Sequence, residues 1–565
     1  MHILKYLILI FLLIYLRING ASPKPVIGEN GMVVSSCEYA SLAGIEILKK
    51  GGNAVDASVA TGFALAVTLP NAGNLGGGGF MVGLMSDKST FSLDFREKAP
   101  EKATKDMFLD SEGNIIPYMS LYNHAASGVP GTVHGLLNAL KDQGSRKVSL
   151  SQILAPAIKL ASKGFILSNE KASLFNSYRD LFENNNAAKN IFIKKDKSLW
   201  KAGDKIIQSD LAKTLRRIRK DGINGFYKNY TANLIVEEMK QGNGLITYKD
   251  LNNYKSSYRK PIKGTFNNYE IISMGPPSSG GALLINMLNM LENFNLDTIG
   301  WNSSDYIHLL TEIERRAYAD RSEHMGDPDF WSVPIKMLTS KKYAKNRIKD
   351  ISLQEASKSK DVFPGNFYKT ENIETTHYSI VDKFGNAISI TTTLNTNFGS
   401  GIIVRGAGFF LNNEMDDFVS KPGVPNYYGL VGNEANSIEA NKRPLSSMTP
   451  TIVLRNGSPF IILGSPGGST IITSVMQVIL NATVFGMDIQ EAVSSPRFHS
   501  QWLPDLIMIE PRSFPKDIIN NLKKRGHNLS IYRNGYIGEV NAILINNNYF
   551  NGASDVRTDG SAIGY

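Results

Sequence analysis

Residues 375–393, TTHYSIVDKFGNAISITTT, are the stretch that most limits what this chain can fold into. Two runs rich in β-branched and aromatic residues flank a short turn, Lys383–Asn386, and this pattern predicts an antiparallel hairpin. The hairpin begins on two adjacent threonines directly after a polar stretch. Strand propensity explains why threonine is present but not why the strand starts so abruptly. The fold must therefore contain an antiparallel sheet.

The N-terminal third begins with two expected helices. Leu42, Ile45 and Leu48 recur at helical spacing, and Gly51–Gly52–Asn53 supplies a stop. A second helix, rich in Ala and Val, follows to Thr68, and its small side chains predict close packing. A glycine-rich turn then leads into strand-like residues.

The rest of the chain mixes helices with strands. Residues 149–260 are mostly of helical composition, a strand and a helix follow near residue 270, and another helix starts near Ser304, a good N-cap. Residues 350–374 are polar and predict an exposed loop. Strands are predicted at GAGFFLNN and at PTIVLRNGSPFIILG, where an Asn-Gly turn marks a hairpin, and a helix follows. This order favours the α+β class with packed layers.

Composition narrows the function classes. The chain has 565 residues, 42% hydrophobic and 20% charged, with a net charge of +10. Its lysines are scattered among acids, which is not typical of a nucleic-acid-binding arm, so we predict no nucleic-acid partner. Cys37 is the one cysteine, so intrachain disulfides are excluded, and its helical context predicts burial.

The N-terminus, residues 1–22, resembles a secretory signal. Lys5 precedes an apolar run from Tyr6 to Leu16, and small residues follow at Gly20–Ser22. The run is shorter than the ~20 residues that cross a bilayer. We therefore expect an exported protein, periplasmic or secreted. An uncleaved signal that anchors the protein to the membrane is the alternative.

Several kinds of site are missing from the sequence. It has no HExxH, CxxC or P-loop pattern, and the glycines of GNLGGGGF follow a helix and precede a strand, unlike a dinucleotide fingerprint. His308, His324 and His377 show no ligand spacing. We predict neither a metal nor a cofactor.

Short polar clusters remain as candidates for chemistry. Taken singly, each has a plain structural explanation, since acid pairs usually lie on the surface and Ser-Ser or Gly-Gly pairs usually form turns. The clusters are Arg96 in LDFREKAP, Glu414, Asp416 and Asp417 in LNNEMDDF, Ser446–Ser447 in KRPLSSMTP, and Gly467–Gly468 in GSPGGST.

Together these clusters resemble a known family. The motifs GGNAVDASVA, NLGGGGFM, LDFREKAP, GPPSSGG, TTHYSIVD, NNEMDDF, NKRPLSSMTPTIV and GSPGGS occur in order from about Gly31 to the C-terminus. The sequence is similar to gamma-glutamyltranspeptidases (glutathione hydrolases) of the bacterial type, in the N-terminal-nucleophile hydrolase superfamily. The resemblance implies a four-layer αββα sandwich.

The resemblance also implies that the precursor cleaves itself at Glu374–Thr375. A large subunit, residues 23–374, and a small catalytic subunit, residues 375–565, would stay together as one unit. Thr375 would then be the nucleophile. The chemistry is reasonable, because a threonine hydroxyl needs a nearby base, and a free α-amino group with a pKa of about 7.7–8.0 is suited to that work.

The same resemblance assigns roles to the other clusters. Thr393 would orient the Thr375 hydroxyl, and the N–H groups of Gly467 and Gly468 would form the oxyanion hole. The substrate-binding residues would be Arg96, Ser446 and Ser447 for an α-carboxylate, and Asn395, Glu414 and Asp417 for an α-ammonium. Tyr428 would lie in a lid over the pocket. Thr470 departs from the pattern, since bacterial relatives often have arginine there.

The implied activity is that of a γ-glutamyltransferase and glutathione hydrolase without cofactors. Glutathione and related compounds would be donors, and water, amino acids or peptides would be acceptors. The lid-like loop favours this reading over a related acylase or capsule transpeptidase. An inactive γ-glutamyl-binding member is a further alternative. The balance of hydrolysis and transfer and the preferred acceptor are left open by the sequence.

Overall fold

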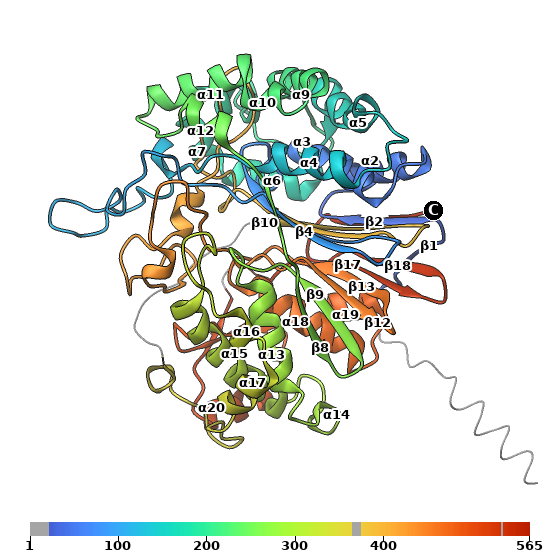
Figure 1. Cartoon of the computed structure of the whole chain (residues 1–565), viewed down its shortest axis with the longest axis vertical. Coiled ribbons are helices and arrows are strands. Elements are labelled where there is room, and N and C mark those ends of the chain that lie inside the picture. Colours follow the sequence, from blue (N-terminus) through green and yellow to red (C-terminus); the bar gives the residue numbers. More distant parts are fainter. Residues whose placement is uncertain (1–21, 364–374, 533–534) are drawn as a thin grey trace, which may run out of the picture.

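The computed structural model describes residues 22–363, 375–532 and 535–565. The predicted signal segment lies outside these residues except for Ser22, and Glu374 lies outside them too. Figure 1 shows four layers, in which two sheets lie face to face and helices cover the outer side of each. The predicted αββα arrangement is therefore confirmed.

The predicted threonine hairpin lies in the middle of the first sheet. In β10 and β11, Thr375 is opposite Thr393 and Val381 is opposite Ala387, and every residue of both strands is buried. The described strands of this sheet are antiparallel, in the order β19 (Ser561–Gly564), β2 (Gly31–Ser35), β10 (Thr375–Asp382), β11 (Ala387–Thr393), β3 (Gly78–Leu84), β4 (Thr90–Asp94) and β7 (Ser257–Arg259).

The second sheet contains the predicted Asn-Gly hairpin. Asn456 and Gly457 have φ of 54° and 71°, the left-handed conformation that a tight two-residue hairpin turn requires. The described strands are antiparallel, in the order β1 (Val26–Gly28), β18 (Tyr549–Ala553), β17 (Asn541–Asn546), β13 (Ser458–Gly464), β12 (Thr451–Arg455), β9 (Tyr269–Ser273) and β8 (Ile262–Phe266). The Ser389 hydroxyl donates across the sheet interface to the Leu463 carbonyl at 3.0 Å.

The helices over the first sheet include the two predicted near the N-terminus. Asn53 and Asp56 form a capping box at the start of α3, and a Cβ at Gly44 would lie 2.4 Å from Thr61 Oγ1, so α2 and α3 pack closely. This layer contains α2 (Glu38–Lys49), α3 (Ala54–Thr68), α4 (Thr132–Gln143), α5 (Leu150–Lys163), α9 (Ser209–Asp221), α10 (Asn224–Tyr227), α11 (Asn229–Gln241) and α12 (Tyr248–Asn253), with α6 (Asn169–Ser177), α7 (Arg179–Glu183) and α8 (Asn186–Phe192) at one end.

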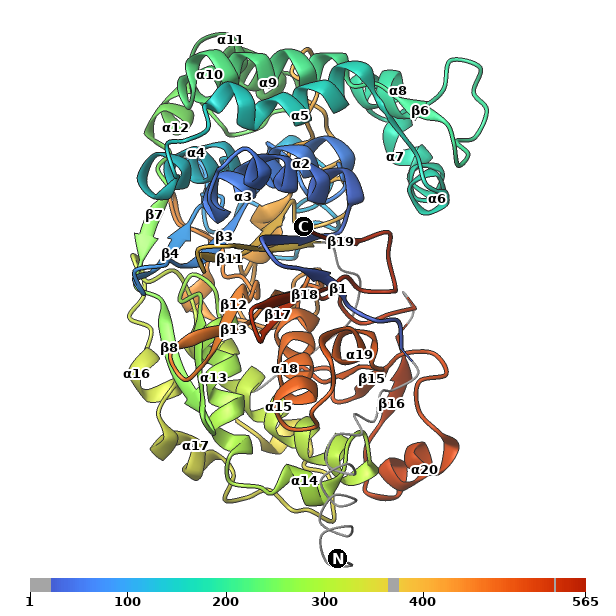
Figure 2. The ribbon, with the colours of Figure 1, turned by 90° about the vertical axis from the view of Figure 1, so that its right-hand side faces the viewer.

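The helices over the second sheet surround α15, which is buried along most of its length. Figure 2 shows this layer below the sheets. It contains α13 (Gly280–Leu291), α14 (Leu296–Ile299), α15 (Ser304–His324), α16 (Ile335–Leu338), α17 (Lys341–Arg347), α18 (Thr470–Thr483), α19 (Ile489–Ser494) and α20 (Lys516–Lys524), with the small strands β14 (Phe498–His499), β15 (Ile507–Ile509) and β16 (Leu529–Ile531) beside it.

Some local predictions need correction. The helix near residue 304 is capped by the Ser303 hydroxyl rather than by Ser304. GAGFFLNN forms no strand, because Gly406 and Gly408 have φ of 74° and 80°, and Phe410 and Leu411 make only isolated bridges. Residues 350–363 are not simply an exposed loop, since Ser359 is buried. Cys37 is buried as predicted.

Among the described residues, no helix combines the length and apolar character that crossing a bilayer requires.

Candidate active site

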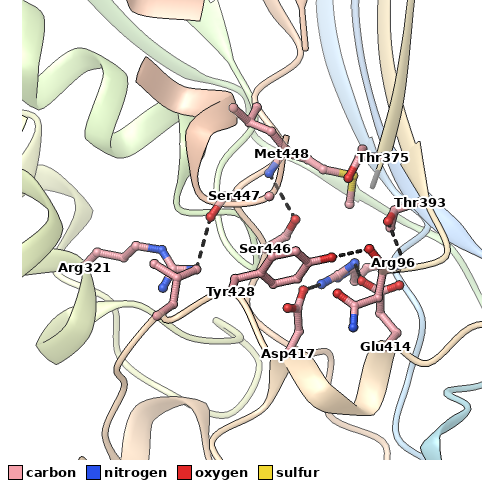
Figure 3. Close-up of a pocket in the computed structure, with 14 residues that line it drawn as sticks. Arg96, Arg321, Thr375, Thr393, Glu414, Asp417, Tyr428, Ser446, Ser447 and Met448 are labelled. Carbon is pink, nitrogen blue, oxygen red and sulfur yellow. Dashed lines mark hydrogen bonds and ion pairs between the residues drawn. The ribbon is translucent and has the colours of Figure 1, made fainter. Parts of the chain in front are cut away.

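A pocket lies where β10 begins and β11 ends, and it contains most of the predicted site. Every described residue to which the resemblance assigned a role lines it except Gly467. Figure 3 shows the side chains converging from both subunit ranges. The lining residues are Arg96, Arg321, Thr375, Thr393, Asn395, Glu414, Asp417, Tyr428, Leu430, Ser446, Ser447, Met448, Gly468 and Ile471.

The two threonines lie at the sheet edge of the pocket. Because β10 and β11 pair in register, Thr375 and Thr393 are directly opposite each other, and both are buried. The Asn395 N–H donates to Thr393 Oγ1 at 2.8 Å, which fixes that side chain beside Thr375. Thr375 is thus both the first residue of β10 and part of the wall of the pocket.

The glycine pair forms the turn between β13 and α18. Gly467 and Gly468 have φ of 139° and 50°, and a Cβ at Gly468 would lie 2.7 Å from the Tyr428 ring. The Thr470 hydroxyl donates to the Gly467 carbonyl at 2.9 Å, so this threonine holds the turn that precedes the helix. Backbone N–H groups at such a helix start are suited to bind a developing negative charge.

The buried charges of the pocket pair with one another. Arg96 contacts Glu414 and Asp417 directly and lies 3.5 Å from Glu97. The sequence assigned Arg96 to an anion and the two acids to a cation, and it missed that they pair in the absence of ligand. Burial raises the pKa of Glu414 well above its usual value and that of Glu97 to about 7, although Arg96 opposes both shifts.

Four acceptor atoms in this cluster have no hydrogen-bond partner among the described residues, namely both carboxylate oxygens of Glu97 and one oxygen each of Asn395 and Glu414. Asn395 Oδ1 and Glu414 Oε2 are buried and accept no hydrogen bond from any described residue. The Asn395 amide is oriented by its own donation to the Asn413 carbonyl at 3.0 Å. Buried acceptors without donors are costly, so both atoms favour a ligand that brings N–H groups.

The predicted lid residue closes the pocket on one side. The Tyr428 hydroxyl donates to the Asn395 carbonyl, and the side chain of Gln501 donates to the Tyr428 carbonyl at 3.1 Å. Burial raises the pKa of Tyr428 well above its usual value, so this hydroxyl stays a donor. The loop around Tyr428 is therefore tied at both its side chain and its backbone.

Arg321 lines the pocket although sequence reasoning did not select it. It lies on α15, and an arginine within a helix carries no sequence signal that separates a buried one from a solvated one. Asp416, which the sequence grouped with the site acids, does not line this pocket. It accepts from the Ser120 hydroxyl at 2.6 Å and from the Tyr427 N–H at 3.0 Å.

A second polar cluster lies away from the pocket. His308, Glu312 and His527 bring three metal-binding side chains together, which the sequence missed because His527 is far along the chain. Protein partners already occupy these groups. His308 Nδ1 lies 2.7 Å from His527 Nε2, His308 Nε2 lies 2.7 Å from the Ser352 carbonyl, and Arg316 donates to Glu312 at 2.7 Å. We interpret the cluster as a hydrogen-bonded dock for residues 350–363.

Comparison with solved structures agrees with this architecture. A cephalosporin acylase from Bacillus halodurans superposes with a TM-score of 0.86 at 25% identity, covering 98% of both chains. A Helicobacter pylori gamma-glutamyltranspeptidase has 44% identity and a TM-score of 0.57, covering 63% of this chain and 99% of that one.

Comparison of sequences shows to which family the chain belongs. The glutathione hydrolase proenzyme of Escherichia coli (strain K12) is 46% identical over 544 residues, which cover 96% of this chain and 93% of the relative. The model of the gamma-glutamyltranspeptidase family matches residues 40–565. With a match of that extent and a relative this similar along nearly its whole length, the chain belongs to the gamma-glutamyltranspeptidase family.

Proposed function

We propose that this protein is an autoprocessing γ-glutamyl hydrolase and transferase that acts on glutathione and related γ-glutamyl compounds. The observation that carries the proposal is the position of Thr375, at the start of a central strand and inside a pocket that contains buried groups of both charges. The name of the Escherichia coli relative, a glutathione hydrolase proenzyme, supports both the substrate and the need for maturation.

Maturation would cleave Glu374–Thr375 and produce chains 23–374 and 375–565. The Helicobacter pylori structure supports this division, because one of its chains is matched almost entirely yet covers only 63% of this one. That share is close to what residues 23–374 would occupy. Cleavage also makes the base, since the amide nitrogen of Thr375 cannot accept a proton whereas a free amine can.

The proposed reaction begins at the new N-terminus. The freed amine takes the proton of the Thr375 hydroxyl, and the oxygen attacks the γ-glutamyl carbonyl carbon. The N–H groups of Gly467 and Gly468 stabilise the oxyanion, and the protonated amine returns its proton to the departing amine, cysteinylglycine when glutathione is the donor. Water, or an acceptor amino acid or peptide, then attacks the ester and releases Thr375.

Recognition uses the charged end of the γ-glutamyl group. Its α-carboxylate would bind Arg96 with Ser446 and Ser447, and its α-ammonium would bind Asp417, Glu414 and Asn395. These groups are buried and pair with one another, so the α-carboxylate and α-ammonium of a substrate would take the place of internal ion-pair partners.

Hydrolysis of an acyl group without an amino-acid end is the second candidate, because the cephalosporin acylase has the same fold. An uncharged acyl group would leave the buried acceptors of Asn395 and Glu414 without donors. This pocket is therefore a poor match for such a substrate.

The test is intact mass and a denaturing gel of the purified protein beside its Thr375→Ala and Thr375→Ser variants. The wild type should give two chains, the smaller starting at Thr375, and should release cysteinylglycine from glutathione. The alanine variant should stay one chain, and the serine variant, which keeps a hydroxyl, should still cleave. A folded wild type that remains one chain would refute the mechanism and favour an inactive binding protein.

Export to the periplasm or the medium is part of the proposal. It rests on the apolar run Tyr6–Leu16, the basic residues on either side and the small residues Gly20–Ser22. Cell fractionation tests it, and recovery of the protein in the cytoplasmic fraction would contradict it. N-terminal sequencing of the large chain separates a cleaved signal from the uncleaved membrane anchor, in which the chain would still begin at Met1.

A further inference from the structure

Arg321 is the buried charged group of the pocket that the proposed mechanism leaves unused. It extends from α15 in the helical layer toward the serine pair and is only 5% exposed. Figure 3 shows it on the far side of Ser447 from Thr375. Long charged side chains are rarely buried to this extent without a partner, so its contacts require an explanation.

The Arg321 guanidinium donates to two serines, of which Ser447 lines the pocket. Its Nε donates to Ser279 Oγ at 2.9 Å, and one terminal nitrogen donates to Ser447 Oγ at 3.3 Å. The Ser279 hydroxyl in turn donates to the Ser446 carbonyl at 2.8 Å. Arg321 therefore contacts the Ser447 hydroxyl directly and the Ser446 backbone through one intermediate.

These contacts fix which way the hydroxyl hydrogens point. An arginine only donates, so Ser447 Oγ must accept from it, and the O–H of Ser447 is left to point elsewhere. The N–H of Met448 donates to Ser446 Oγ at 3.1 Å and has the same effect there. Both serines line the pocket and accept from other groups, so their O–H groups remain available to donate to a bound anion.

Arg321 also lacks an ion-pair contact among the described residues. Arg96 is in ion-pair contact with three carboxylates, whereas no ion pair between described residues includes Arg321. Burial lowers the pKa of Arg321 to about 10, with a smaller contribution from the positive charge of Arg96, and Tyr318 and Asp417 only partly oppose this shift. Asp417 itself is paired with Arg96. A bound anion would therefore supply the negative charge that the protein does not place beside Arg321.

We propose that Arg321 is a positioning residue that selects donors with a free α-carboxylate, by holding Ser447 as a hydrogen-bond donor and by placing an unpaired positive charge behind it. This inference rests on the proposed function, since it concerns the same pocket. It gives the two arginines different roles. Arg96 pairs with Glu414 and Asp417, the acids assigned to the substrate α-ammonium, whereas Arg321 holds Ser447, which is assigned to the substrate α-carboxylate.

The experiment compares two chromogenic donors that differ in one group. γ-Glutamyl-p-nitroanilide has the α-carboxylate, and 4-aminobutanoyl-p-nitroanilide lacks only that group. We would measure kcat and KM for the processed wild type and for Arg321→Gln and Arg321→Lys. A charge-assisted hydrogen bond contributes on the order of 1.5–3 kcal/mol, which corresponds to about 10- to 100-fold in affinity.

The expected result is a selective loss. Arg321→Gln should raise KM for the γ-glutamyl donor about 10-fold or more with kcat within about threefold, and should leave kcat/KM for the 4-aminobutanoyl donor unchanged. Arg321→Lys, which keeps the charge but cannot reach both serines, should lie in between. In Ser447→Ala, Arg321→Gln should cost less than in the wild type, because the two residues act together.

Equal fractional losses on both donors, in either Arg321 variant, would overturn the inference and indicate a purely structural arginine. If Arg321→Gln fails to fold, or fails to be cleaved into two chains, Arg321→Lys decides the question. Failure of the proposed function would look different, because the wild type itself would then release no p-nitroaniline from the γ-glutamyl donor.

Discussion

Asp417→Asn provides the sharpest test of how the pocket recognises an ammonium group. The Asp417 side chain is 11% exposed and pairs with Arg96, and its other oxygen accepts from Asn426 Nδ2 at 3.3 Å. Asparagine has the same shape and keeps one acceptor for Arg96, so we expect the chain to fold and to cleave. What it removes is the negative charge offered to a substrate α-ammonium.

The magnitude follows from that single charge. Hydrogen bonds to charged groups are worth on the order of 1.5–3 kcal/mol, so kcat/KM for γ-glutamyl-p-nitroanilide should fall about 10- to 100-fold. Glutaryl-p-nitroanilide, which lacks only the α-amino group, should lose less than about threefold. The weakened contact with Arg96 is common to both donors and cancels from the comparison.

The assay is steady-state kinetics of both donors on wild type and variant, after a denaturing gel has shown equal processing. If both donors lose the same factor, Asp417 acts only by holding Arg96, and its assignment to the ammonium is wrong. If neither donor is affected, the pocket reads the ammonium elsewhere, with Asn395 and Glu414 as the remaining acceptors.

Three further changes test other features. Gly468→Ala places a Cβ 2.7 Å from the Tyr428 ring and should lower kcat and speed proteolysis of the lid loop, whereas Gly486→Ala, which has a similar positive φ but open space, should change activity little. The free energy of unfolding of Glu97→Gln should rise relative to wild type between pH 5 and 8, by up to about 3 kcal/mol. The folded pKa of Glu97 is raised to about 7, so the wild type loses stability as this carboxyl ionises. A difference in thermal midpoint between variant and wild type that is the same at both pH values would contradict this prediction. As pH falls to 5, His527→Gln should lose about 2 kcal/mol less free energy of unfolding than wild type. Burial lowers the folded pKa of His527 to about 3, so the wild-type stability is present above pH 6.5 and is lost as pH falls. Parallel losses of the thermal midpoint in both proteins would count against this prediction.

The elements that the sequence predicted well are those with local causes. The hairpins around Lys383–Asn386 and Asn456–Gly457 and the capped helix after Asn53 depend on turn and capping residues within a few positions. GAGFFLNN misled because buried loops share the composition of strands. Only the backbone, with left-handed glycines at Gly406 and Gly408, shows the difference.

The parts that could not be predicted depend on contacts between distant residues. The pairing of Arg96 with Glu414 and Asp417 joins residues more than 300 positions apart, so the sequence could identify all three but not show that they neutralise one another. The polar composition of residues 350–363 predicted exposure, but several of these residues hydrogen-bond to side chains of α15. Arg321 also lies on α15, and its burial depends on packing against distant residues that the local sequence does not show.

Cleavage at residue 374 is compatible with a stable protein because both sheets are built from both sides of the cut. In the first sheet, β2 pairs with β10 on one edge and β19 on the other, so a strand from the large chain is held between two from the small chain. In the second sheet, β9 pairs with β12, and β1 pairs with β18. Separating the chains would break these ladders together.

The upstream side of the cut is anchored too. The indole N–H of Trp502 donates to the carbonyls of Ser359 and Val362, both at 2.9 Å, and Arg315 donates to the Ser359 hydroxyl. These bonds join residues 359–362, which belong to the proposed large chain, to Trp502 of the proposed small chain and to Arg315. We therefore expect the two proposed chains to elute together in gel filtration and to separate only in denaturant.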